Sequence, residues 1–283
     1  MKIDLHTHST ASDGTQPPAE VLRSAAEAGL DVVALTDHDT TSGWAEAAAA
    51  ARAHGVMLVP GTEVSCQTED GISVHLLSYL QDPGSAPLAD VMSRARRSRR
   101  SRAQRMVEMI AADHPISWDD VLEQVTGDAT VGRPHIADAL VAAGVAEDRS
   151  EAFRTVLHPR SGYYVGHYAP DPVTAVRLVR EAGGVPVMAH PLAGLRGRTV
   201  GQEVFDAMIA AGLAGLEVAH RDNPPEARAL LSQMAAEHDL IVTGSSDYHG
   251  AGKPNELGEN LTSEQSLRRI MAEAGSATQV VRP

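Results

Sequence analysis

The sequence predicts an α/β fold with a mainly parallel sheet or barrel and a mainly helical lobe inserted between two of its strands. Strand and helix signals alternate over residues 2–79 and again over residues 171–243. Such alternation is typical of parallel strands, because each parallel pair needs a long crossover connection. The stretch between these two regions has mostly helical signals and no clear strand. We therefore expect a barrel formed by residues 1–82 and 166–283 and a lobe at residues 83–165.

The first half of the predicted barrel contains two helices and five strands. Pro17 and Pro18 indicate the start of the first helix, because proline is tolerated in a first turn, and Gly29 ends it. Ser42 is expected to cap an Ala-rich helix that runs to about His54. The strands are expected at residues 2–5, 31–35, 56–59, 62–66 and 73–79, the last two joined by a turn at residues 70 and 71.

The second half repeats the same rhythm. Asp171 and Pro172 form an N-cap and N1 pair, and Gly183 with Gly184 closes the helix that they begin. Strands are expected at residues 185–189, 215–218 and 240–243, and further helices at residues 200–211 and 224–238.

The composition bounds the class of protein. Only 3% of the residues are aromatic while 43% are hydrophobic, so the core must consist mainly of Ala, Val and Leu. The single cysteine, Cys66, excludes an intramolecular disulfide and fits a reducing compartment. A net charge of -13 argues against a broad surface for long duplex nucleic acid. The N-terminal residues lack a signal-peptide pattern and no apolar run is long enough to span a membrane, so we expect a cytoplasmic protein.

Histidines and carboxylates recur at the ends of the predicted strands. The C-terminal ends of barrel strands meet on one face, where such folds place active sites. A mixture of imidazole and carboxylate suits zinc, manganese or iron(II), and the number of groups exceeds what one ion can bind, so two or three divalent transition-metal ions are expected. The groups are His6, His8, Asp13, Asp37, His38, Glu63, His75, His190, Asp247 and His249.

Each group also has a structural interpretation. A lone His-x-His pair such as His6 and His8 occurs by chance, and a buried His75 could be a core histidine with satisfied hydrogen bonds. Asp37 and Asp39 could cap a helix, and Asp39 is expected to do so, with Thr40 or Thr41 as rivals. The repetition of these residue types at successive strand ends favours the metal site for the set as a whole.

These residues resemble the polymerase and histidinol phosphatase (PHP) family of metal-dependent phosphoesterases. The motifs that carry the resemblance are DLHTHSTASDG at residues 4–14, ALTDHD at 34–39, PGTEVS at 60–65, His75, AHP at 189–191 and SSDYHG at 245–250. The resemblance implies a distorted (β/α)7 TIM-like barrel that holds three ions.

The resemblance also implies a ligand set for each ion. The first ion is expected on His6, His8, Glu63 and Asp247. The second is expected on Glu63, His75 and His190, and the third on Asp13, His38 and His249. Asp37 would orient a ligand from outside the coordination sphere. Glu63, Asp247 and His249 are the expected catalytic residues.

The lobe is expected to determine the substrate. Residues 131–137, VGRPHIA, are similar to the subgroup of nucleoside 3',5'-bisphosphate phosphatases and 5'-3' exoribonucleases. Arg133 and His135 would then hold a substrate phosphate, because a guanidinium fork matches phosphate oxygens. Arg160 and His220 are further candidates for phosphate binding. We interpret the arginine-rich residues 94–105 as a solvated helix face rather than an RNA-binding strip.

The predicted activity is hydrolysis of a phosphate ester by a metal-activated hydroxide. The expected substrate is a 3',5'-bisphosphate nucleotide or a short 5'-phosphorylated oligonucleotide. The alternatives are a histidinol-phosphate type of small-metabolite phosphatase and, less favoured by the Asp-x-His ending at Asp247 and His249, an amidohydrolase. A non-catalytic metal-binding module is disfavoured because no ligand is missing.

Overall fold

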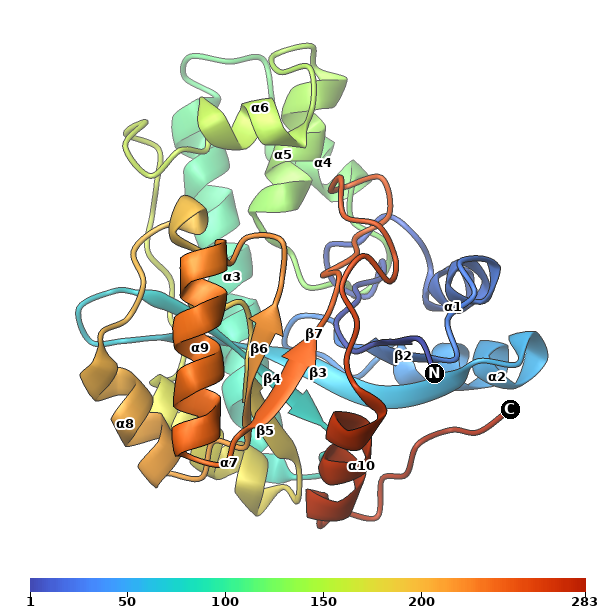
Figure 1. The fold of residues 1–283 in the computed structure, drawn as a ribbon. Helices are drawn as coiled ribbons and strands as arrows, with labels where there is room; N and C mark the ends of the chain where they lie inside the picture. Colours follow the sequence, from blue (N-terminus) through green and yellow to red (C-terminus); the bar gives the residue numbers. More distant parts are fainter.

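The centre of the molecule is a seven-stranded sheet that curves into a nearly closed barrel with helices around it (Figure 1). The computed structural model describes residues 1–283, except for the side chain of Arg196. The strands follow one another in chain order around the barrel. They are β1 Ile3–Asp4, β2 Val32–Leu35, β3 Met57–Gln67, β4 Ser73–Tyr79, β5 Val185–Met188, β6 Gly215–Ala219 and β7 Ile241–Gly244. The predicted α/β barrel is confirmed.

β3 is one long strand where the sequence predicts two, because its two halves have different neighbours. Residues 57–60 pair in parallel with β2, up to the pair of Leu35 with Pro60. From Gly61 onward β3 pairs antiparallel with β4, beginning with Tyr79. Pro60 lacks an N–H, but its carbonyl accepts a hydrogen bond from Leu80 N at 2.9 Å, so the strand continues through it. β4 is also antiparallel to β5, and the remaining pairs are parallel.

The helices surround the barrel and form the lobe. They are α1 Pro18–Glu27, α2 Trp44–His54, α3 Ala86–Ile110, α4 Trp118–Glu123, α5 Arg133–Ala142, α6 Arg149–Arg154, α7 Pro172–Glu181, the 3-10 turn η1 Gly194–Arg196, α8 Gln202–Ala210, α9 Pro225–Glu237 and α10 Glu264–Glu273. Asp171 caps α7 as predicted, accepting from Thr174 N at 3.0 Å. The predicted cap at Ser42 is wrong, because the N-cap of α2 is Gly43. The hydroxyl of Ser42 instead accepts a hydrogen bond from the hydroxyl of Thr40.

Helices α4, α5 and α6 gather at one end of the molecule, and the long α3 connects them to the barrel (Figure 1). The first turns of α3 belong to the barrel core, where Leu88 and Met92 pack in one cluster with Val64. Its last turns belong to the lobe core, where Met106 packs in one cluster with Ile136. Because α3 contributes to both cores, the division at residues 83 and 165 stays a prediction. None of the described helices combines the length and the apolar character needed to cross a bilayer.

Hydrogen bonds between the two ends of the chain close the barrel. Thr7 and Tyr248 form a parallel bridge, and His8 N donates to the Tyr248 carbonyl at 2.8 Å. The buried carboxylate of Asp4 accepts from Ser246 N at 3.0 Å and from Gly258 N at 2.9 Å. Burial raises the pKa of Asp4 to about 6 even though these hydrogen bonds lower it. The first strand is therefore fixed by residues from the last quarter of the sequence.

Candidate metal centre

The predicted ligands come from both ends of the sequence and converge on one site. His6 and His8 follow β1, His38 follows β2, His190 follows β5, and Asp247 with His249 follows β7. His75 lies within β4, as the sequence predicts. Glu63 lies in the middle of β3 rather than after a strand, because β3 is longer than predicted.

Glu63 lies at the centre of this site and is 1% exposed. Its Oε1 atom is 2.7 Å from Nδ1 of His75 and 3.3 Å from Nε2 of His190. Its Oε2 atom is 3.0 Å from Nε2 of His8 and 3.3 Å from Nε2 of His6. Oε2 is also 3.3 Å from Nδ1 of His38, so the two carboxylate oxygens face different sets of imidazoles. This arrangement suits a carboxylate bridging two cations.

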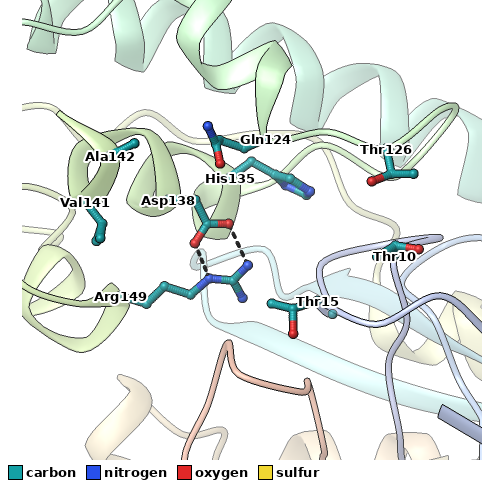
Figure 2. Close-up of a pocket in the computed structure, with 10 residues that line it drawn as sticks. Thr10, Thr15, Gln124, Thr126, His135, Asp138, Val141, Ala142 and Arg149 are labelled. Carbon is teal, nitrogen blue, oxygen red and sulfur yellow. Dashed lines mark hydrogen bonds and ion pairs between the residues drawn. The ribbon is translucent and has the colours of Figure 1, made fainter. Parts of the chain in front are cut away.

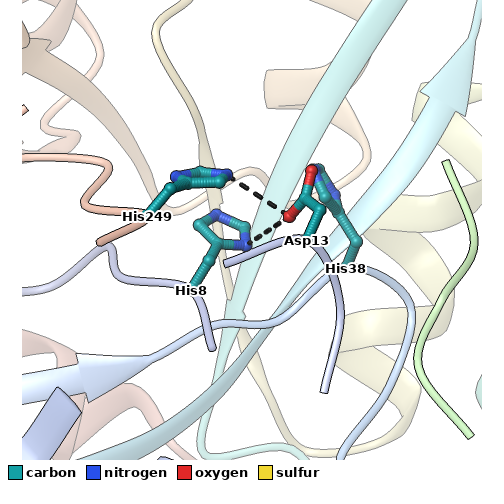
Figure 3. Close-up of side chains that lie close together, drawn as sticks. All are labelled: His8, Asp13, His38 and His249. Atoms are coloured by element: carbon teal, nitrogen blue, oxygen red, sulfur yellow. Dashed lines mark ion pairs between the residues drawn. The ribbon is translucent and has the colours of Figure 1, made fainter. Parts of the chain in front are cut away.

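Three groups of side chains place their ligand atoms within 4.8 Å of one another. The first, His6, His8, Glu63 and Asp247, is the set that the family resemblance implies for the first ion. The second contains Asp13, His38 and His249 as implied for the third ion, together with His8 (Figure 3). The third contains His38, Glu63 and His75. The family resemblance implies Glu63, His75 and His190 for the second ion, so His38 takes the place of His190 in this group. His190 is nevertheless close to Glu63.

Several details fit cations between these groups. Nδ1 of His38 lies 3.3 Å from Glu63, and Nε2 of His249 lies 3.3 Å from Asp13. Both ring nitrogens are buried, and neither makes a hydrogen bond to the described part of the chain, as expected for lone pairs directed at an ion. His190 and Asp247 also have positive φ angles of 30° and 56°. Such backbone conformations cost about 1–3 kcal/mol and concentrate at functional sites.

The electrostatics of the site require positive charge near its carboxylates. Burial raises the pKa of Glu63, but His38, His75 and His6 outweigh it and hold the pKa well below its usual range. Burial lowers the pKa of His6, but Glu217 and then Glu63 outweigh it and raise the pKa well above its usual range. Cations could replace the imidazole protons that balance these charges, and binding would then release protons.

Three further carboxylates surround the ligands. Glu217, which the sequence analysis missed, is buried in β6; its Oε1 is 2.9 Å from Nδ1 of His6, and its Oε2 accepts from His190 N at 2.7 Å. Asp37, whose orienting role stays a prediction, accepts from Ser9 N at 2.8 Å and so holds the loop that carries Asp13. The helix cap expected at Asp39 is wrong, because this carboxylate accepts from Ser65 N at 2.8 Å.

The structure separates the four predicted phosphate-binding residues. His220 is fully buried in the metal centre, with Nε2 3.6 Å from Oδ2 of Asp247. His135 is buried at the start of α5, where its Nδ1 accepts from Gly132 N at 3.2 Å. Arg160 is exposed on a lobe loop. Arg133 lies over the rings of Phe153 and Tyr164, with its guanidinium carbon 5.2 and 5.6 Å from their centroids.

The interpretation of residues 94–105 as a solvated face is wrong for two arginines, because one side of α3 packs against the barrel. Arg99 is 8% exposed and Arg102 is 3% exposed. Nε of Arg99 is 3.3 Å from Oδ2 of Asp39, and its Nη2 donates to the hydroxyl of Ser65. Ser65 pairs directly with His75 across β3 and β4. Arg99 therefore lies beside the metal ligands.

Arg99, Arg102, Arg133 and His167 form a group that we call the arginine cluster. Nη1 of Arg102 is 3.1 Å from Nδ1 of His167. Burial, followed by repulsion from Arg99 and Arg133, lowers the pKa of Arg102 to about 9. Burial and the nearby arginines lower the pKa of His167 to about 2. The cluster therefore gathers positive charge next to the metal ligands, buried at Arg99 and Arg102 and half-buried at Arg133.

Comparison with known proteins shows the family of this chain. The family model described as the PHP domain matches residues 4–152, which is more than half of the chain. This chain belongs to the PHP family. The PHP protein is 35% identical to a 3',5'-nucleoside bisphosphate phosphatase of Chromobacterium violaceum, over 89% of this chain and 88% of that protein. It is 33% identical to a 5'-3' exoribonuclease of Haemophilus influenzae, over 92% of this chain and 94% of that enzyme.

A solved structure from Bifidobacterium adolescentis, named as a metal-dependent phosphoesterase, is also similar to the PHP protein. It has a TM-score of 0.95 and 47% sequence identity and covers 97% of each chain. The predicted family and enzyme class are confirmed: the PHP protein is a metal-dependent phosphoesterase, and its His, Asp and Glu groups can hold metal.

Proposed function

We propose that this PHP protein hydrolyses one phosphate ester of a substrate that carries a second phosphate. The substrate is a 3',5'-bisphosphate nucleotide or a short 5'-phosphorylated oligonucleotide. The observation that carries this proposal is the arginine cluster, which lies next to the metal ligands and has more positive than negative charge. A cytoplasmic location, predicted from the sequence, accords with such a substrate and is part of the same proposal.

The proposed ion sites keep the sets that the family resemblance implies. Divalent manganese, zinc or iron would bind three sets of side chains: His6, His8, Glu63 and Asp247; Glu63, His75 and His190; and Asp13, His38 and His249. Bound ions of this kind lower the pKa of water and neutralise phosphoryl oxygens. Glu217 would hold His6 in the orientation that directs its Nε2 towards the ion.

The arginine cluster would hold the phosphate that is not cleaved. Asp39 offsets the charge of Arg99. Arg102 and Arg133 have no carboxylate within 4.0 Å among the described side chains. Burial of a cation without an anionic partner costs free energy, and a phosphate dianion would provide that partner through several charge-assisted hydrogen bonds. The arginine cluster would thus provide a binding site for an anion.

The positive charge of the arginine cluster also favours a substrate with two phosphates over one with a single phosphate. A histidinol-phosphate type of substrate has one phosphate, so placing it on the ions would leave Arg102 and Arg133 without an anion. The names of the two relatives, a nucleoside bisphosphate phosphatase and an exoribonuclease, support a nucleotide substrate.

The test compares phosphate release from adenosine 3',5'-bisphosphate, adenosine 3'-monophosphate and histidinol phosphate with mononucleotide release from a short 5'-phosphorylated RNA, and metal content is measured on the same samples. We expect kcat/KM for the bisphosphate to exceed that for the monophosphate by roughly 30-fold or more, because one buried charge pair contributes about 2 kcal/mol or more. Arg102→Met should reduce this ratio, whereas Arg97→Met, on the exposed side of the same helix, should leave it unchanged. Equal rates on the two adenosine nucleotides would contradict the proposal.

A further inference from the structure

The lobe makes three hydrogen bonds to the backbone of the loops that carry metal ligands. Thr130 N donates to the Ala11 carbonyl at 3.2 Å, and Thr130 Oγ1 donates to the His38 carbonyl at 2.8 Å. Nη1 of Arg149, from α6, donates to the Asp13 carbonyl at 3.0 Å. Two of the acceptors are the carbonyls of the ligand residues Asp13 and His38. The third is the carbonyl of Ala11, two positions before Asp13.

Arg149 is fixed from both sides. Its Nε and Nη2 atoms donate to the two carboxylate oxygens of Asp138 at 2.5 and 2.6 Å, and its side chain is 12% exposed (Figure 2). On the other side it passes Gly252, where an added Cβ would lie 2.1 Å from Nη1. Gly252 N in turn donates to the His249 carbonyl at 3.3 Å. Arg149 therefore lies between the loop of Asp13 and the turn of His249.

Thr130 contacts the backbone of the ligand residue His38. It is 2% exposed, so both of its hydrogen bonds are shielded from water. Together, Thr130 and Arg149 touch the loops of Asp13, His38 and His249, which are the three ligands of one proposed ion. Figure 2 shows Arg149 and Asp138 lining a cavity of about 440 Å³ between the lobe and the loop that carries Asp13.

Each of the other two proposed ion sets contains Glu63, and one of them also contains His75. Glu63 and His75 lie inside the paired strands β3 and β4, so the ladder of the sheet fixes their backbone. Asp13, by contrast, lies in a loop outside the named strands, and its position depends on hydrogen bonds from elsewhere. Loss of the lobe contacts should therefore weaken the ion site of Asp13 more than the two sites that contain Glu63.

We propose that Thr130 and Arg149 are positioning residues that assemble the ion site of Asp13, His38 and His249, so that the docked lobe determines whether the third ion is held. The proposal rests on the ion assignment in the proposed function. It makes the lobe part of the metal centre as well as a cover for the substrate.

The test measures ions per chain rather than activity alone. Metal-free wild type, Thr130→Val and Arg149→Met would be titrated with Mn²⁺, with bound metal counted by elemental analysis and manganese coupling followed by electron paramagnetic resonance. We expect three ions in the wild type, and a third ion that binds about 10–100-fold more weakly in both variants, the usual effect of removing a group that orients a ligand.

Matched variants separate positioning from general damage to the fold. Thr130→Ser keeps the hydroxyl and should restore the third ion. Arg154→Met removes an exposed arginine of the same helix and should bind all three ions. Wild-type affinity for all three ions in Thr130→Val and Arg149→Met would overturn the inference alone, as would equal weakening of all three. Fewer than three ions in the wild type would overturn the ion assignment of the proposed function as well.

Discussion

Replacing Arg102 with methionine should make the ligand-free protein more stable while it impairs the enzyme. Arg102 is 3% exposed, and its one hydrogen bond among the described residues is with His167. Its neighbours Arg99 and Arg133 repel it. Methionine is similar in length and flexible, so it can fill the same space without a charge.

The magnitude follows from the pKa of Arg102, which burial and the neighbouring arginines lower to about 9. This is about 3 to 4 pH units below that of a free arginine, and at about 1.4 kcal/mol per unit it corresponds to about 5 kcal/mol of unfavourable interaction as an upper limit. Loss of the hydrogen bond to His167 costs about 1 kcal/mol. Relaxation around the charge reduces the gain further, so we expect a net stabilisation of about 2 kcal/mol.

The assay is urea unfolding of metal-free wild type, Arg102→Met and Arg97→Met, with and without adenosine 3',5'-bisphosphate, which the metal-free protein should not hydrolyse. Without nucleotide, the midpoint should rise for Arg102→Met and stay constant for Arg97→Met. With nucleotide, the wild type should be stabilised more than Arg102→Met, because at a given concentration a ligand that binds the folded state more tightly stabilises it more. A lower midpoint for Arg102→Met without nucleotide would refute the reasoning, since it would mean that a partner already offsets this charge.

Four further predictions concern the metal centre and the arginine cluster. Glu63→Gln should lower kcat by about 1000-fold or more and reduce bound metal in elemental analysis, because one carboxylate faces two ion sets. Glu217→Gln should weaken metal binding about 10–100-fold in a competition titration with a chelator, since the carboxylate no longer orients His6. The folded-state pKa of His167, about 2, lies below its unfolded value, so the unfolded chain binds more protons below pH 6.5. The wild type should therefore lose stability relative to His167→Gln as the pH falls from 6.5 towards 4, by at most about 1.4 kcal/mol per pH unit, measured by urea unfolding. Removal of metal should abolish phosphate release and lower Tm, and Mn²⁺ should restore both; an unchanged Tm would argue against ions bound in the folded state.

Sequence reasoning located the metal centre because strand ends in a barrel meet on one face. His6, His8, His38 and His190 follow short buried strands, whose apolar runs are visible in the sequence. Their convergence then follows from the architecture. Asp247 and His249 follow the same logic after β7. The family motifs added the grouping of these residues into ion sets.

Other features depend on packing that local sequence does not contain. Glu217 lies inside β6 rather than at its end, and the curvature of the barrel directs it at His6. Arg99 and Arg102 lie on a helix with arginines on several sides, so the sequence does not indicate which side meets the barrel. Asp39 resembles a helix cap until β3 brings Ser65 within hydrogen-bonding distance.

The placement of the ligands along the chain sets an order for assembly during synthesis. Domains fold as the chain emerges from its N-terminus. One group, His38, Glu63 and His75, lies within the first 79 residues, on β3, β4 and the loop after β2. The other two groups need Asp247 or His249, and the bridge between Thr7 and Tyr248 forms at the same late stage. Before residues 247–249 are synthesised, the chain can thus complete at most one of these groups, and the other two form only after β7 has been added.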